Sequence, residues 1–145
     1  ARPSYGGDMT PDRTAALPEP ENVVIKGVRD EPSHEDGRRV LVGRLWPRGV
    51  SKERAALDEW AKDATPSTAL RRAFHSGDLT WEQFVPAYRA ELEEEPRAVE
   101  AVERLRAEAL QGRVALRIAG HDRNRTHARV LREAILGESD PDLPR

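Results

Sequence analysis

Three short apolar runs limit the folds open to this chain. Residues 22–28, 39–46 and 113–120 are rich in β-branched and aliphatic residues and have the length of strands. A long stretch with helical spacing separates the second run from the third, and another helix is expected at about 127–136. Connections this long join parallel strands and place helices on the sheet. The sequence therefore predicts an α/β fold: a small, mainly parallel sheet of about three strands covered by about five helices, with more helix than strand.

The helical stretch carries its own boundary signals. Ser51 is a candidate N-cap for a helix that extends to about Lys62. Thr80 is a candidate N-cap for a later helix, in which Pro86 predicts a kink. Pro96 suits the first turn of the next helix. Three aromatic side chains at helical spacing are expected in the core: Trp81, Phe84 and Tyr88.

The length of 145 residues suits one domain. Residues 1–20 contain four prolines, two adjacent glycines and no periodic apolar pattern, which predicts a disordered or loosely packed leader. Residues 21–137 are expected to form a single α/β domain. A polar tail is expected over residues 138–145.

The composition excludes several kinds of chemistry. The absence of cysteine excludes disulfides, thiolate nucleophiles and thiolate metal sites. A formal net charge of −2 gives no overall attraction to nucleic acid or anionic membranes, although the basic charge is nearly all arginine. No apolar run approaches the ~18 residues of a membrane span, and no secretory signal is present, so a cytoplasmic location is expected. Phosphate-loop, dinucleotide and serine-elbow motifs are missing, and no cofactor is predicted.

The run RLWPRG (residues 44–49) at the end of the second predicted strand has two interpretations. Strand alternation would place Arg44 and Trp46 on the same side, within reach of guanidinium–indole stacking. Pro47 and Gly49 end the strand, so the run either terminates it with an aromatic plug over the core or forms the floor of a site. Open parallel sheets bind ligands beyond the carboxyl ends of their strands. In such a site Arg44 and Arg48 would bind anionic oxygens and Trp46 would stack on a planar ligand.

The run GHDRNRTH (residues 120–127) follows the third predicted strand and leads into the last helix. A helix N-terminus together with Arg123 and Arg125 favours an anion there. Asp122, paired with His121 or His127, is the candidate for proton transfer. Asp122 equally suits a cap of its own loop or a partner for an arginine.

Two further positions on the third strand and its loop bear on the site. Arg117 lies between Ala115 and Ala119, so either that face of the strand is open or the arginine reaches into the same crevice. His121 and His127 are six residues apart, which is not a metal-ligand spacing, and no metal site is predicted.

A resemblance to a known family rests on three stretches, DGRRVLVGRLWPRGVSKERAALDEWAKDATPSTALRRAFH, WEQFVPAYRAEL and VALRIAGHDRNRTHARVLREAI. Through them, residues 21–137 resemble the YeaO-like family, known as domain of unknown function 488. The resemblance implies a compact α/β fold and carries over no catalytic role, because the family's activity is not established. Relatives usually have Asp at the position of Gly43 and a more acidic loop after the third strand, whereas Asp122 and Ala128 match. The crevice of this chain is therefore expected to be unusually basic.

Two ligand-binding or interaction functions are compatible with these features, besides a structural or regulatory role without a ligand. The first is a small enzyme or ligand-binding domain that recognises an anionic or planar small molecule, such as a nucleotide or phosphorylated metabolite, between the RLWPRG turn and the GHDRNRTH loop. The alternative is a nucleic-acid or protein interaction module whose basic segment, residues 123–129, contacts phosphates.

Overall fold

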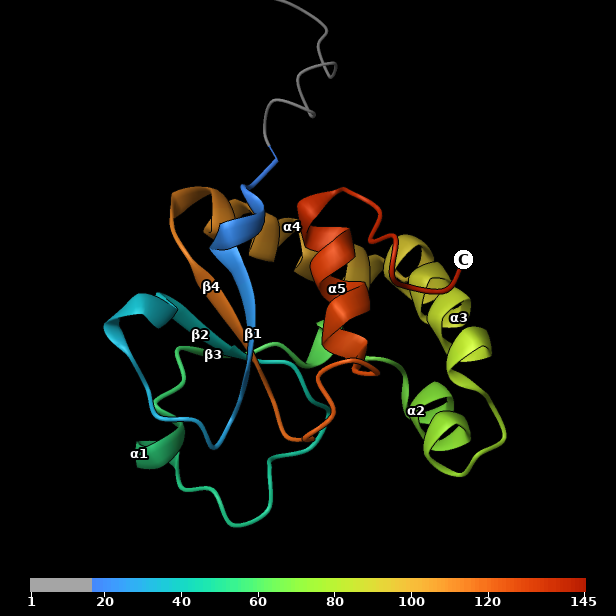
Figure 1. Cartoon of the computed structure of the whole chain (residues 1–145), viewed down its shortest axis with the longest axis horizontal. Coiled ribbons are helices and arrows are strands. Elements are labelled where there is room, and N and C mark those ends of the chain that lie inside the picture. The colour runs from blue at the N-terminus through green and yellow to red at the C-terminus, as the bar shows by residue number, and fades with distance from the viewer. Residues whose placement is uncertain (1–16) are drawn as a thin grey trace, which may run out of the picture.

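The computed structural model describes residues 17–145, so residues 1–16 of the predicted leader lie outside it. The described chain forms one four-stranded, fully parallel sheet with helices packed against it (Figure 1). The predicted fold class is confirmed, with one strand more than expected. The strands are β1 (Val23–Gly27), β2 (Arg38–Leu41), β3 (Glu59–Trp60) and β4 (Val114–Ile118), in the order β1-β4-β2-β3. The α-helices are α1 (Lys52–Ala55), α2 (Thr68–His75), α3 (Trp81–Glu94), α4 (Pro96–Gln111) and α5 (His127–Leu136).

The sheet brings together segments that are far apart in the sequence. β4 lies between β1 and β2, and Leu116 pairs with Ile25 on one side and Val40 on the other. Because all strands are parallel, their carboxyl ends share one edge of the sheet. The segments that follow β2 and β4 therefore meet at that edge, as the RLWPRG and GHDRNRTH interpretation requires.

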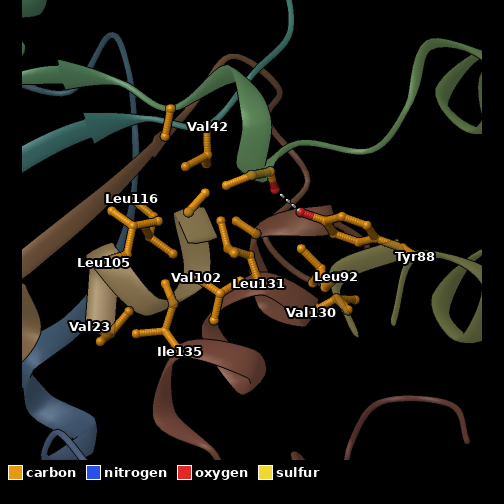
Figure 2. Packing of buried hydrophobic residues seen from close by; sticks show 14 of the residues in the cluster. Val23, Val42, Tyr88, Leu92, Val102, Leu105, Leu116, Val130, Leu131 and Ile135 are labelled. Carbon is orange, nitrogen blue, oxygen red and sulfur yellow. Dashed lines mark hydrogen bonds between the residues drawn. The ribbon is translucent and has the colours of Figure 1, made fainter. Parts of the chain in front are cut away.

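One face of the sheet carries the main core. Helices α4 and α5 pack against the strands, α3 packs on α4 and α5, and α2 packs on α3 (Figure 1). Figure 2 shows Leu116 of β4 and Val42, which directly follows β2, in the same cluster as Leu105 of α4 and Leu131 of α5. The predicted core aromatics are buried, with exposed fractions of 7% for Trp81, 2% for Phe84 and 0% for Tyr88.

The helix predicted from Ser51 to about Lys62 is wrong beyond Ala55. Ser51 is the N-cap, since its side chain accepts a hydrogen bond from the Arg54 amide, but α1 ends at Ala55 and the next residue is left-handed with φ 49°. The chain then turns to form β3, in which Trp60 pairs with Leu41 of β2. Pairing of Glu59 and Trp60 with β2 is therefore favoured over a continuation of α1, because the helix propensity of so short a segment is weak.

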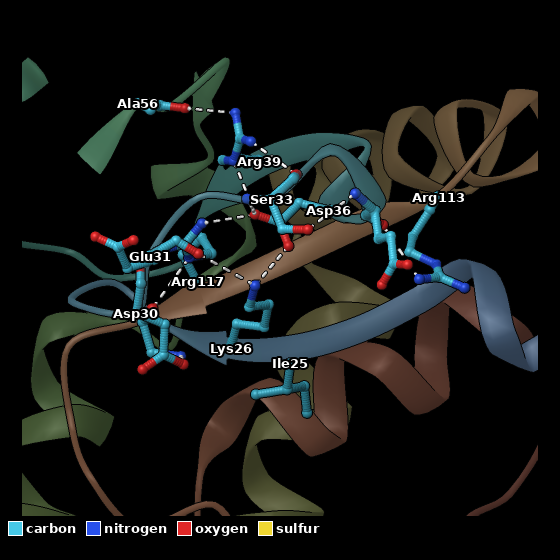
Figure 3. Close-up of polar contacts among 12 residues, drawn as sticks. Ile25, Lys26, Asp30, Glu31, Ser33, Asp36, Arg39, Ala56, Arg113 and Arg117 are labelled. Carbon is cyan, nitrogen blue, oxygen red and sulfur yellow. Dashed lines mark hydrogen bonds and ion pairs between the residues drawn. The ribbon is translucent and has the colours of Figure 1, made fainter. Parts of the chain in front are cut away.

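The other face of the sheet is covered by residues 28–37 and α1 and contains a group of charges that is buried at its centre and partly exposed at its rim (Figure 3). We call Lys26, Asp36, Arg39 and Arg117 the ion cluster. The Asp36 carboxylate is 2.6 Å from Lys26 Nζ, 2.9 Å from Arg39 Nε and 3.4 Å from an Arg117 terminal nitrogen. Burial alone would raise the pKa of Asp36, but hydrogen bonds from Lys26, the Ser33 amide and Arg39 hold it well below its usual range. Asp36 therefore stays ionised inside the protein.

The segment predicted as a polar tail packs against the domain. Leu143 is 5% exposed and belongs to the main core, and an Arg89 terminal nitrogen donates to the Pro144 carbonyl at 2.6 Å. None of the helices in residues 17–145 is both long and apolar enough to cross a membrane.

Candidate functional site

A cavity of about 350 Å³ opens at the carboxyl edge of the sheet, and we call it the carboxyl-edge cavity. Residues 42–45 after β2 form one wall, and residues 118–122 and 125–127, between the end of β4 and the start of α5, form another. The third wall comes from α2 and the chain just before it, with Phe84 of α3 behind. The α2 residues that line the cavity are Arg71, Phe74 and His75, and the preceding ones are Thr65 and Pro66.

Five of the predicted site residues meet in this cavity. Arg44 comes from the segment after β2, and the others come from the segment between β4 and the start of α5. They are Arg44, His121, Asp122, Arg125 and His127. Parallel pairing of β2 with β4 is the reason, because it places the ends of both strands at the same edge.

Trp46 and Arg48 lie elsewhere, and the expectation that Arg44 and Trp46 face the same side is wrong. β2 ends at Leu41, so the two-residue alternation of a strand does not extend to residue 46. The Trp46 indole packs edge-on to Trp60 with ring centroids 5.5 Å apart, and its Nε1 donates to the Val50 carbonyl at 2.6 Å. Arg48 is exposed and does not line the cavity. Trp46 thus acts as the aromatic plug of the first interpretation.

Two other predicted ligand-binding arginines also point away from the cavity. Arg117 is fully buried in the ion cluster, where its guanidinium donates to the Gly27 carbonyl at 3.1 Å and the Asp30 carbonyl at 2.7 Å. Neither of the two expectations for Arg117 describes this position, because residues 28–37 cover its face of the sheet. Arg123 pairs with the Asp30 carboxylate at 2.9 Å and donates to the Ile25 carbonyl at the outer edge of β1.

Asp122 caps its own loop. Its Oδ1 accepts hydrogen bonds from the backbone amides of Asn124 at 2.8 Å and Arg125 at 3.0 Å. The amide hydrogen bonds from Arg125 and then Asn124 lower the pKa of Asp122, since both stabilise the carboxylate form. Asp122 is therefore ionised at neutral pH and holds the loop that contributes Arg125 to the cavity.

His127 joins the start of α5 to the end of β2. Its Nε2 contacts the Val42 carbonyl, and because a carbonyl only accepts, Nε2 carries the proton and Nδ1 is the unprotonated nitrogen. Burial lowers the pKa of His127, so its ring is neutral at pH 7. The ring also meets Tyr88 edge-on, with centroids 6.1 Å apart. His127 is thus held by the protein on two sides.

Acid is expected to destabilise the wild-type protein more than the His127→Gln variant. Because folding lowers the pKa of His127, the unfolded chain binds the proton more readily. The stabilising contribution of the neutral ring is complete above the unfolded value of about 6.5 and is lost as the pH falls through the folded value. Coulombic interaction with His75 lowers the pKa of His127 further, and buried Tyr88 stays neutral because burial raises its pKa.

Urea unfolding of both proteins between about pH 7.5 and pH 5 measures this difference. His121→Gln is the matched control, because His121 is exposed. Parallel loss of stability in wild type and His127→Gln would contradict the assignment.

The cationic side chains of the cavity have hydrogen-bond donors to spare. The Nε atom of Arg71 is buried and has no partner among the described residues, a situation that ordinarily costs about 1–3 kcal/mol. Arg44 uses its Nε for the Pro66 carbonyl at 3.0 Å, and its terminal nitrogens make no hydrogen bond to residues 17–145. Arg125 likewise makes no side-chain bond within the described chain. By contrast, Arg123 and Arg129 of the basic segment are paired with Asp30 and Asp140.

Sequence reasoning missed the contribution of α2. Arg71, Phe74 and His75 are spaced three and four residues apart, which puts them on one face of a helix. That spacing could have identified a shared helix face, but it does not predict which part of the molecule this face of α2 contacts. Among residues 17–145, no group of three or more His, Cys, Asp or Glu side chains is placed to hold a metal ion.

In a comparison with known proteins, residues 22–142 match a family model described as the inactive DUF488-N3 subclade. The uncharacterised protein YeaO of Escherichia coli is 51% identical over 71 residues, which cover 49% of this chain and 62% of YeaO. The uncharacterised proteins Rv3073c of Mycobacterium tuberculosis and Mb3100c of Mycobacterium bovis are 32% identical over 117 residues, which cover 79% of this chain and 94% of each relative. No solved structure matches the chain.

Proposed function

The chain belongs to the inactive DUF488-N3 subclade, and we propose that it is a binding domain that holds a small anionic molecule in the carboxyl-edge cavity without transforming it. The observation that carries the proposal is the set of free cationic donors in that cavity. Arg44, Arg71 and Arg125 line it with guanidinium nitrogens that have no partner among residues 17–145, and the Asp122 carboxylate in the same cavity already accepts hydrogen bonds from its own loop. An anion is the ligand that such an environment favours.

The size and the other lining residues support a small ligand. A volume of about 350 Å³ is near the lower end of the range for ligand sites, roughly 300–1,000 Å³. Apolar side chains such as Phe74 and Ile118 line the cavity between the charged groups. Small-molecule sites commonly combine an apolar surface with a few placed polar groups.

The state of the titratable groups argues for binding rather than catalysis. Asp122 is ionised and engaged by two backbone amides, and the protonated nitrogen of His127 is engaged by the Val42 carbonyl. Because the surroundings lower the pKa of both groups, Asp122 is ionised and His127 is neutral at neutral pH, so neither is in the protonated form that a general acid requires. The description of the subclade as inactive agrees with this.

Ligands are expected to stabilise wild type and to lose that effect when the cavity arginines are replaced. A thermal-shift screen would use nucleotides, phosphorylated metabolites and small organic acids. Arg125→Gln and Arg44→Gln should each weaken binding of any ligand found by roughly tenfold or more, since a charge-assisted hydrogen bond contributes about 1.5–3 kcal/mol. Arg48→Gln is the matched control, because Arg48 is exposed outside the cavity.

Two results would contradict the proposal. One is a ligand whose affinity changes as much in Arg48→Gln as in Arg125→Gln, since it would bind outside the cavity. The other is chemical conversion of a bound ligand during prolonged incubation, followed by NMR, because the domain would then be an enzyme.

A further inference from the structure

Helix α2 contributes a face to the cavity that combines one cation with an apolar surface. Arg71, Phe74 and His75 lie on that face and line the cavity, whereas Arg72 between them is exposed and does not. The helix packs on α3, which positions it. The hydroxyl of its N-cap Ser67 donates a hydrogen bond to the Glu91 carboxylate of α3 at 2.6 Å. The face is thus held rigidly against the opening at the carboxyl edge.

Arg71 differs from the other cavity arginines in having a buried guanidinium nitrogen without a hydrogen-bond partner in the described chain. Its side chain is half-buried and its Nε atom is buried without any hydrogen-bond partner in residues 17–145. No carboxylate of the described chain forms an ion pair with it. A buried guanidinium donor is costly to leave unpaired, so an oxyanion at this position relieves that cost.

The surface next to Arg71 is flat and apolar. Phe74 stacks on Phe84 with ring centroids 4.6 Å apart and an angle of 26° between the rings. Val42 and Ile118 line the cavity from the sheet. A flat apolar body gains contact area and aromatic stacking against such a surface.

We infer that the cavity takes small organic acids with a flat apolar body, and that Arg71 binds their carboxylate as a planar pair while Phe74 contacts the body. A planar guanidinium matches a carboxylate in geometry and in charge. A dianionic phosphate is the poorer match, because more charge would have to be desolvated beside Phe74 and Ile118. This inference rests on the proposed function and specifies its ligand class and its main anchoring residue.

The test uses four probes on the full chain: benzoate, its neutral analogue benzamide, acetate without the aromatic body, and phenyl phosphate. NMR titration measures the affinity of each and reports the residues that respond. Benzoate is expected to perturb α2 and the segments that follow β2 and β4, and to bind at least about tenfold more tightly than the other three probes.

Arg71→Gln is expected to weaken benzoate binding by about 10- to 100-fold, as the loss of a charge-assisted pair implies. Arg72→Gln is the matched control on the same helix and should bind benzoate as wild type does. Arg71→Lys keeps the charge without the planar fork and should also bind at least about tenfold more weakly, which serves if Arg71→Gln fails to fold.

The outcomes separate this inference from the proposed function. Unchanged benzoate binding in Arg71→Gln together with its loss in Arg125→Gln would overturn the role of Arg71 and leave an anion site in the cavity. Tighter binding of phenyl phosphate than of benzoate would overturn the ligand class alone. If no anionic probe or metabolite perturbs the cavity residues, both the inference and the proposed function fail.

Discussion

Replacing Asp36 by alanine is expected to lower the free energy of unfolding by about 3–5 kcal/mol, the usual cost of removing one partner from a buried ion pair. Asp36 is 2% exposed and Arg117 is 0% exposed, so solvent does not screen their interaction. The substitution leaves the Arg117 charge buried, with only the Gly27 and Asp30 carbonyls to receive its hydrogen bonds. It also removes the carboxylate that Lys26 and Arg39 share in the ion cluster (Figure 3).

Urea unfolding of Asp36→Ala, compared with Glu35→Ala, measures this cost. Glu35 is the neighbouring exposed carboxylate, and its replacement should change the stability by less than about 0.5 kcal/mol. The double variant Asp36→Leu/Arg117→Met should be more stable than Asp36→Ala, because it removes both buried charges. A loss below about 1 kcal/mol in Asp36→Ala would contradict a structural role for the ion cluster.

Gly37→Ala is expected to destabilise the protein by at least about 3 kcal/mol through backbone strain and a clash with the residue that precedes β4. Gly37 has φ 67°, and a Cβ atom added there would lie 2.1 Å from the Arg113 carbonyl oxygen. That oxygen accepts the Arg38 amide at 2.9 Å, which is the first hydrogen bond between β2 and the segment that leads into β4. Relief of the clash therefore requires the start of β2 to move away from its partner.

Gly49→Ala is the matched control for this substitution. Gly49 has a similar φ of 76° but no heavy atom within 4 Å of an added Cβ, so strain acts alone and should cost about 1 kcal/mol. Urea unfolding of the two variants measures the difference. Equal losses would show that the close approach to Arg113 has no consequence for stability.

Much of the fold could be predicted because its signals are local. The apolar runs that became β1, β2 and β4, the caps at Ser51 and Thr80, and the opening of α4 at Pro96 all depend on residues within a few positions of one another. β3 was missed because its two residues have no strand pattern of their own. Its formation depends on β2, whose Arg39 amide donates to the Asp58 carboxylate at 2.8 Å.

The site could be predicted only in part. Parallel strands share a carboxyl edge, which predicts that Arg44 lies near the segment after β4. In the structure both line the same cavity. The position of Trp46 could not be derived, because strand alternation no longer applies once β2 has ended. The contribution of Arg71 to the cavity could not be derived either, since the packing of α2 on α3 decides which way that face of α2 points.

The sequence by itself determined the α/β class, most element boundaries and the edge of the sheet where two basic segments meet, because periodicity, caps and parallel connections are properties of neighbouring residues. Only the tertiary structure decided which basic side chains face the cavity. Arg117 shows the reason: its carboxylate partner Asp36 is 81 residues away in sequence, and the loop that carries Asp36 closes one face of the sheet. Burial and charge compensation at that distance depend on how the elements pack. Packing placed Arg117 in the ion cluster and left guanidinium nitrogens of Arg44, Arg71 and Arg125 without a hydrogen-bond partner among residues 17–145.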